Sequence, residues 1–109
     1  MMTDLEWNRE FALEQMGDDE DFLAEMLKLH QQTSITDLEK IKQAIQAGNK
    51  DAAREAAHSI KGASANLGLV AMQRTAEEME SAARDDKLDV TEGKITLMGE
   101  MIGLIDQLK

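Results

Sequence analysis

The residues best suited to chemistry are a histidine, a lysine and a glycine within the stretch AAHSIKGASANLG, residues 56–68 of this 109-residue chain. In a helix, Lys61 and Gly62 follow His58 by three and four residues and share its face. A neutral imidazole is a nucleophile, an ammonium stabilises an incoming phosphoryl group, and a glycine leaves room for a tetrahedral electrophile. The spacing predicts that His58 accepts a phosphoryl group, with Lys61 as the stabilising cation and Gly62 as steric clearance.

Other interpretations of His58 fit less well. A metal site is disfavoured because Lys61 would repel the ion and no second ligand lies at helical spacing. A hydrolase is disfavoured because no set of nucleophile, base and orienting residue is visible. We therefore expect no metal and no cofactor. The remaining alternative is an ordinary exposed histidine beside an ordinary lysine.

The region around His58 predicts a surface for an acidic partner. Residues 56–76 contain no Asp or Glu, although the chain has 22 acidic residues and a net charge of −10. Such a window on an acidic protein favours docking of another acidic protein. Arg54 and Arg74 could equally be solvated surface residues with no docking role. Ala65 and Leu69 are small or apolar and would allow a partner to approach closely. The expected docking residues are Arg54, Ala65, Leu69 and Arg74.

Apolar residues recur at helical spacing between turns marked by glycine and charge. The pattern predicts long helices over about residues 20–47, 50–66, 69–83 and 90–108. A shorter helix with Leu5 and Phe11 precedes them, and Thr3 and Glu6 could form its capping box. The chain has no proline and no tyrosine, which disfavours a sheet. We expect a single all-α domain over residues 1–109, an antiparallel four-helix bundle with an additional short N-terminal helix.

The helical phase assigns roles to individual residues. The seam of the third helix is predicted to contain Ala53, Ala57, Ile60, Ser64 and Leu67, which puts His58 on its flank. His30 falls on the apolar stripe of the preceding helix and is expected to be a partly buried structural residue. Glu77, Glu78 and Glu80 are expected on solvated faces. Trp7 is expected to pack the first helix over the bundle.

Composition excludes several partners. A chain with a net charge of −10 is not expected to bind nucleic acid or an anionic membrane. No apolar run approaches the roughly 20 residues of a membrane span, and no secretory signal is visible. The absence of cysteine fits a reducing compartment. We expect a cytoplasmic monomer.

The stretch AAHSIKGASANLG, residues 56–68, resembles the signature of histidine-containing phosphotransfer (HPt) domains, in which A-H-x-[LI]-K-G precedes small residues and a glycine. Two further segments, GDDEDFLAEMLKLH and AIQAGNKDAAREAAH, look like the family's second helix and its approach to the active histidine. One departure is His30, where many members carry phenylalanine. The matching residues are Ala57, His58, Ile60, Lys61, Gly62, Ser64, Asn66, Leu67 and Gly68.

This resemblance implies a helical phosphoryl carrier without kinase activity of its own. His58 would take a phosphoryl group from the receiver domain of a hybrid sensor kinase and pass it to that of a response regulator. The Mg²⁺ of the reaction would belong to the receiver. Two alternatives stay open: the N-terminal phosphoacceptor domain of a chemotaxis-type histidine kinase, and a non-catalytic helical protein-binding module.

Overall fold

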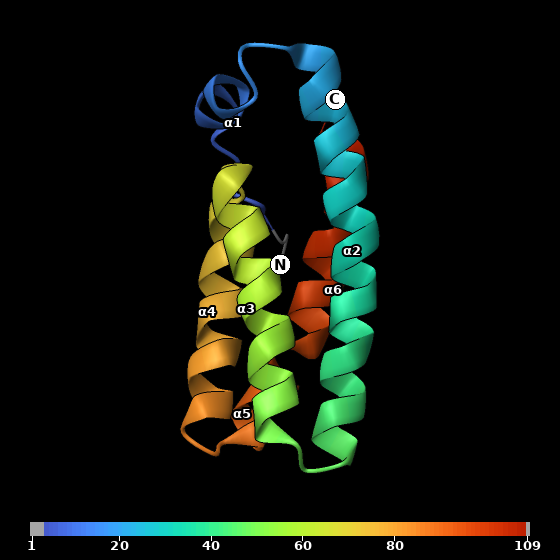
Figure 1. Ribbon diagram of the computed structural model, residues 1–109, viewed down its shortest axis with the longest axis vertical. Coiled ribbons are helices and arrows are strands. Elements are labelled where there is room, and N and C mark those ends of the chain that lie inside the picture. Colours follow the sequence, from blue (N-terminus) through green and yellow to red (C-terminus); the bar gives the residue numbers. More distant parts are fainter. Residues whose placement is uncertain (1–3, 109) are drawn as a thin grey trace.

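The computed structural model describes residues 4–108, and these form an elongated helical bundle (Figure 1). Three helices, α2, α3 and α4, run alternately up and down, and α5 with α6 returns along them as the fourth member. A short helix, α1, lies at the end where α3 meets α4. The bounds are α1 Arg9–Gln15, α2 Glu20–Gln46, α3 Lys50–Asn66, α4 Val70–Arg84, α5 Leu88–Gly93 and α6 Ile95–Leu104, followed by a 3₁₀ turn Ile105–Gln107.

Side-chain caps explain where the first three helices begin. Asn8, Asp19 and Asn49 each precede a helix and accept a hydrogen bond from the backbone N–H three residues later. Glycines at positive φ follow the ends of α1, α2 and α3. These local signals confirm the predicted turns, and the helices predicted over residues 20–47, 50–66 and 69–83 lie within one residue of their observed bounds.

The predicted four-helix bundle is confirmed. All five seam residues predicted for the third helix are buried. The core is made largely of aliphatic and methionine side chains. Its largest fully buried apolar members are Ile41, Ile60, Leu69, Met72, Met79 and Met98.

The prediction of one continuous helix over residues 90–108 is wrong. The chain breaks at Lys94, whose backbone N–H bonds the carbonyl of Thr91 in a tight turn. Thr91 is fully buried, and its hydroxyl donates to the carbonyl oxygen of Met79 at 3.1 Å. This contact holds α5 against α4, and α6 then turns to pack against α2.

The start of the chain also differs from the prediction. Thr3 lies outside the described residues, and Glu6 precedes the first helix at a positive φ of 50°, so the capping box does not begin α1. Leu5 is buried before the helix, and Phe11 is exposed. Trp7 does pack this segment onto the bundle, since its indole N–H donates to the carbonyl of Leu67 at 2.9 Å.

Residues 4–8 form a strap across the connection between α3 and α4. The backbone N–H of Asn8 donates to the carbonyl of Gly68 at 2.9 Å. No side chain caps α4, but the carbonyl of Leu5 accepts the N–H of Ala71 at 3.1 Å. Gly68 sits at φ +66°, and a Cβ there would lie 2.5 Å from the carbonyl oxygen of Asn8. The close approach of the strap therefore requires glycine.

Gly68→Ala is expected to lower the free energy of unfolding by about 2–3 kcal/mol, because left-handed strain adds to the clash with the strap. Gly48→Ala is the matched control, since Gly48 has φ +66° but a Cβ there would meet no atom within 4 Å. This variant should lower the free energy of unfolding by only about 1 kcal/mol, because left-handed strain is its only cost. Urea denaturation measures both values. Equal losses would mean that the strap does not press on Gly68.

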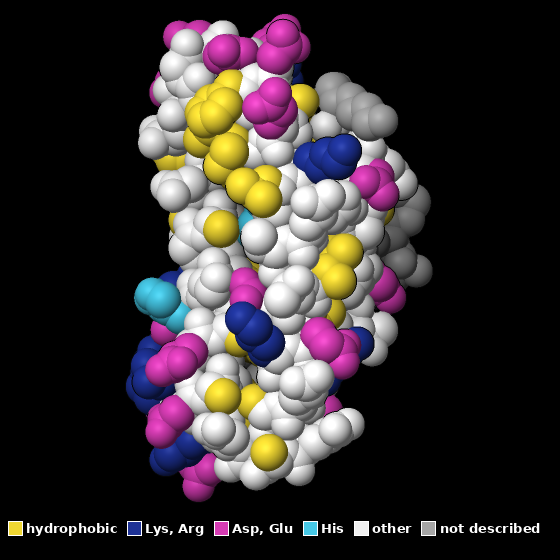
Figure 2. All heavy atoms as spheres, turned by 45° about the vertical axis from the view of Figure 1, so that its right-hand side comes forward, with side chains coloured by type: hydrophobic (Ala, Val, Ile, Leu, Met, Phe, Trp, Pro, Cys, Tyr) yellow, Lys and Arg dark blue, Asp and Glu magenta, His cyan; other side chains and the backbone are white. Residues whose placement is uncertain are grey.

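Large apolar side chains remain exposed on parts of the bundle surface. In Figure 2, hydrophobic side chains gather toward the upper end of one face, below a group of acidic side chains, and a histidine projects at its left edge. The exposed large apolar residues are Phe11, Phe22, Leu29, Ile35, Val70 and Val90.

Candidate functional site

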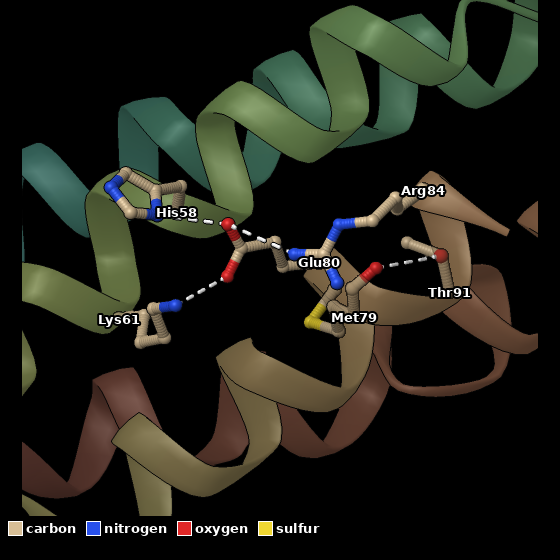
Figure 3. Close-up of polar contacts among 6 residues, drawn as sticks. All are labelled: His58, Lys61, Met79, Glu80, Arg84 and Thr91. Carbon is tan, nitrogen blue, oxygen red and sulfur yellow. Dashed lines mark hydrogen bonds and ion pairs between the residues drawn. The ribbon is translucent and has the colours of Figure 1, made fainter.

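His58 lies on the flank of α3, as predicted, and its side chain is 64% exposed. The neighbouring seam residues Ala57 and Ile60 turn into the core. Because these two residues face the core, the imidazole of His58 extends across the groove between α3 and α4. There its Nδ1 lies 2.8 Å from Oε2 of Glu80, and the other ring nitrogen points away from the carboxylate (Figure 3).

Glu80 is a buried carboxylate at the centre of the site. Its side chain is only 6% exposed, and its second oxygen forms an ion pair with Lys61 at 2.6 Å (Figure 3). Burial raises the pKa of Glu80, but the interactions with Lys61 and His58 outweigh burial and hold the pKa below its usual value. The carboxylate is therefore ionised at neutral pH.

An ionised carboxylate can only accept hydrogen bonds. Nδ1 of His58 must therefore donate its proton to Glu80. In the neutral ring this fixes the tautomer and leaves the lone pair on Nε2, which faces solvent. Nε2 is therefore a nucleophilic nitrogen on the surface, and the hydrogen bond from Nδ1 to Glu80 fixes the orientation of the ring.

Lys61 and Gly62 share the face of His58. The ammonium of Lys61 reaches the same carboxylate as the imidazole, so it lies beside the ring. Gly62 is exposed inside the helix, and a Cβ there would meet no atom within 4 Å beyond the adjacent helix backbone. The fold does not need a glycine at this position, in contrast to Gly68.

The four expected docking residues have different surroundings. The prediction for Leu69 is wrong, because its side chain is fully buried where the strap crosses and cannot contact a partner. Arg74 is exposed but forms an ion pair with Glu6 of the strap. Arg54 and Ala65 are half-buried on α3.

Glu80 is the residue of this candidate site that the sequence did not predict. It was expected on a solvated face, and the acid-free window suggested a surface without carboxylates beside His58. Glu80 instead brings a carboxylate under the imidazole from outside that window. Its helical position carried a signal, because Met72, Ala76 and Glu80 follow at steps of four along the buried side of α4.

His30 belongs to a separate buried polar cluster, so the expectation of a structural histidine is confirmed. Its Nε2 lies 3.0 Å from the hydroxyl of Ser64, and the hydroxyl of Ser34 lies 3.3 Å from Nδ1. Burial lowers the pKa of His30 to about 4, although Asp37 acts in the opposite direction. The ring is therefore neutral at pH 7 and links α2 to α3.

This cluster predicts a loss of stability in weak acid. Folded His30 stays neutral down to about pH 4, whereas an unfolded histidine binds a proton near pH 6.5. The unfolded state gains more protons between these values, so acidification through that window destabilises the fold by up to about 3 kcal/mol. Urea denaturation at several pH values measures this effect. His30→Gln keeps a hydrogen-bonding group without titrating, and parallel curves for it and the wild type would contradict the prediction.

Within residues 4–108, no three side chains of His, Asp or Glu come together to hold a metal ion. None of the described helices is long and apolar enough to cross a membrane.

The bundle and its surface imidazole place the chain in the class of helical phosphotransfer domains. The family model for the Hpt domain matches residues 25–109, so the chain belongs to the Hpt domain family. Such domains act in two-component systems, where they interact with receiver domains, and the chain has a phosphotransfer role of this kind.

A solved structure shares the fold. It is the HPT domain of an Hpt sensor hybrid histidine kinase from Shewanella, 24% identical, with a TM-score of 0.76. The alignment covers 96% of this chain and 92% of that one. No curated protein matches the chain.

Proposed function

We propose that Nε2 of His58 accepts a phosphoryl group from a receiver aspartate of a hybrid sensor kinase and passes it to that of a response regulator. The observation that carries this proposal is the 2.8 Å contact between Nδ1 and the buried carboxylate of Glu80. It orients the ring and keeps the proton on Nδ1, so the lone pair of Nε2 faces the solvent from which a partner arrives.

The transfer balances without a further reactant. The lone pair of Nε2 forms a bond to phosphorus while the P–O bond of the acyl phosphate breaks, and its electron pair stays on the aspartate carboxylate. Nδ1 keeps its proton and the ring becomes cationic, which strengthens its hydrogen bond to Glu80. The cationic ring is a good leaving group, so the reverse step delivers the phosphoryl group to a second receiver.

Lys61 and Gly62 complete the site in this proposal. The ammonium of Lys61 is close enough to the imidazole to turn toward the phosphoryl oxygens as they approach. Gly62 leaves the approach to Nε2 open. The Mg²⁺ of the reaction is held by the receiver.

The receiver contacts the outer face formed by α2 and α3 around His58. Leu29 and Ser59 line one shallow hollow between these helices, and Ser59 is the neighbour of His58. Leu29 and Phe22 are exposed apolar residues on α2, seven residues apart and so on one side of it. Exposed apolar surface of this kind favours a protein partner.

The test is transfer of labelled phosphate. The chain is incubated with a radiolabelled phosphorylated receiver and Mg²⁺, and the label that reaches it is tested for stability. Phosphohistidine is acid-labile and survives alkali, whereas an acyl phosphate is lost in alkali. We expect acid-labile, alkali-stable label on the chain and its return to a second receiver. If no receiver from the same organism transfers label, a non-catalytic binding module is favoured instead.

A further inference from the structure

Glu80 has a third partner that the proposed reaction does not use. Arg84 follows it by one turn of α4, and the guanidinium Nη2 lies 3.7 Å from Oε2 of Glu80 (Figure 3). His58 and Lys61 already contact the same carboxylate at 2.8 and 2.6 Å. The arginine side chain is 56% exposed, so it stands beside the carboxylate, free to move and just beyond hydrogen-bond distance.

Phosphorylation would change the charge balance around this carboxylate. With a neutral imidazole, the charges of Glu80, Lys61 and Arg84 sum to one positive unit. The transferred phosphoryl unit adds one net negative charge and places charged oxygens beside Lys61. An ammonium drawn toward those oxygens is drawn away from Glu80. Glu80 then keeps the cationic imidazole beside Oε2 but loses the ammonium beside Oε1. A carboxylate that is only 6% exposed is destabilised by the loss of one of its charged partners.

We propose that Arg84 is a positioning residue that forms an ion pair with Glu80 in place of Lys61 when a phosphoryl group on His58 attracts Lys61. This inference rests on the proposed function. Closing the distance from 3.7 Å to a charge-assisted hydrogen bond needs a movement of about 1 Å. Arg84 then keeps Glu80 under Nδ1, and the net charge of the group falls to zero. Without Arg84 the same group would carry a net negative charge.

The experiment loads the phosphoryl group chemically, so that it does not depend on a receiver. Potassium phosphoramidate is the donor: the lone pair of Nε2 attacks phosphorus, the P–N bond of the reagent breaks, and ammonia leaves with the bonding pair. The rate of loss from His58 is followed by ³¹P NMR. We expect Arg84→Gln to shorten the half-life roughly threefold, the size of effect expected for an exposed ion pair. The melting temperature of the unphosphorylated chain should stay unchanged.

Three variants make the test specific. Arg74→Gln removes an exposed arginine of the same helix that pairs with Glu6, and it should keep the wild-type half-life. Arg84→Lys keeps the charge and should restore most of the half-life. Arg84→Gln in a Glu80→Gln background should not shorten the half-life further, because no carboxylate remains for Arg84 to pair with.

Each contrary outcome is decisive. A wild-type half-life for Arg84→Gln, or equal losses for Arg84→Gln and Arg74→Gln, would overturn the inference. An undiminished effect of Arg84→Gln in the Glu80→Gln background would mean that Arg84 acts on the phosphoryl group itself, which also overturns it. Failure of phosphoramidate to label His58 would overturn both the site and the inference. Chemical labelling without transfer from any receiver would contradict the relay function alone.

Discussion

His58→Gln is expected to abolish the uptake of acid-labile phosphate from a phosphorylated receiver. Glutamine has no nucleophilic nitrogen, so the P–N bond cannot form. The fold should survive, because the His58 side chain is 64% exposed and makes one hydrogen bond, to Glu80. Surface substitutions of this kind change the free energy of unfolding by about 1 kcal/mol or less. Radiolabel transfer and circular dichroism measure the two properties.

The second histidine makes this result easy to interpret. The chain has two histidines, and any phosphohistidine left in His58→Gln would have to be on His30. His30 is 4% exposed and bonded to two serines, so it is inaccessible to a receiver. His30→Gln should therefore take up label like the wild type. Persistent acid-labile label in His58→Gln, or its loss in His30→Gln, would contradict the assignment of His58.

The bundle and the flank position of His58 were predictable because both follow from local sequence. Helical periodicity fixes which side of α3 is buried, and Ala57 and Ile60 therefore determine where His58 points. Caps and glycines at Asp19, Gly48 and Asn49 fix where the helices begin and end. Each of these signals lies within a few residues of the feature that it specifies.

Glu80 was not predictable in the same way, because its role depends on how α3 and α4 pack. It is 22 residues from His58, and only the register of the two helices brings the carboxylate to 2.8 Å. Acidity alone suggested solvent exposure. Burial of an acid is favourable only with partners, and here the two nearest partners, His58 and Lys61, come from another helix. The steps of four from Met72 to Glu80 could indicate burial but could not identify its contacts.

The errors at the two ends have a similar origin. The periodicity of residues 90–108 is continuous, yet buried Thr91 and its bond to Met79 hold α5 against α4 and the chain turns at Lys94. The strap of residues 4–8 is fixed by bonds to Gly68 and Ala71, far away in sequence. In both places, tertiary contacts override or replace the local signal.

Gly62→Gln is expected to slow phosphoryl transfer by roughly a hundredfold or more while leaving the fold intact. The Cα–Cβ bond of a helical residue tilts toward the N-terminus, so a long side chain at position 62 would lie over the turn that contains His58. A displacement of about 1 Å in the approach of a reacting group is enough for losses of this size. Stability should rise by up to about 1 kcal/mol, because glycine is a poor helix former and a Cβ at Gly62 meets no atom within 4 Å beyond the adjacent helix backbone.

Two control variants separate obstruction from any effect on the helix. Gly62→Ala adds only a methyl group and should keep most of the transfer rate with a similar gain in stability. Gly103→Gln adds the same side chain in α6, at another exposed glycine with open space, and should leave transfer unchanged. Normal transfer by Gly62→Gln would mean that the receiver reaches Nε2 from the other side of His58. The unstrained, uncrowded Gly62 would then have no explanation in either the fold or the reaction. A joint rise in stability and fall in transfer shows that the glycine serves the reaction at the expense of the helix.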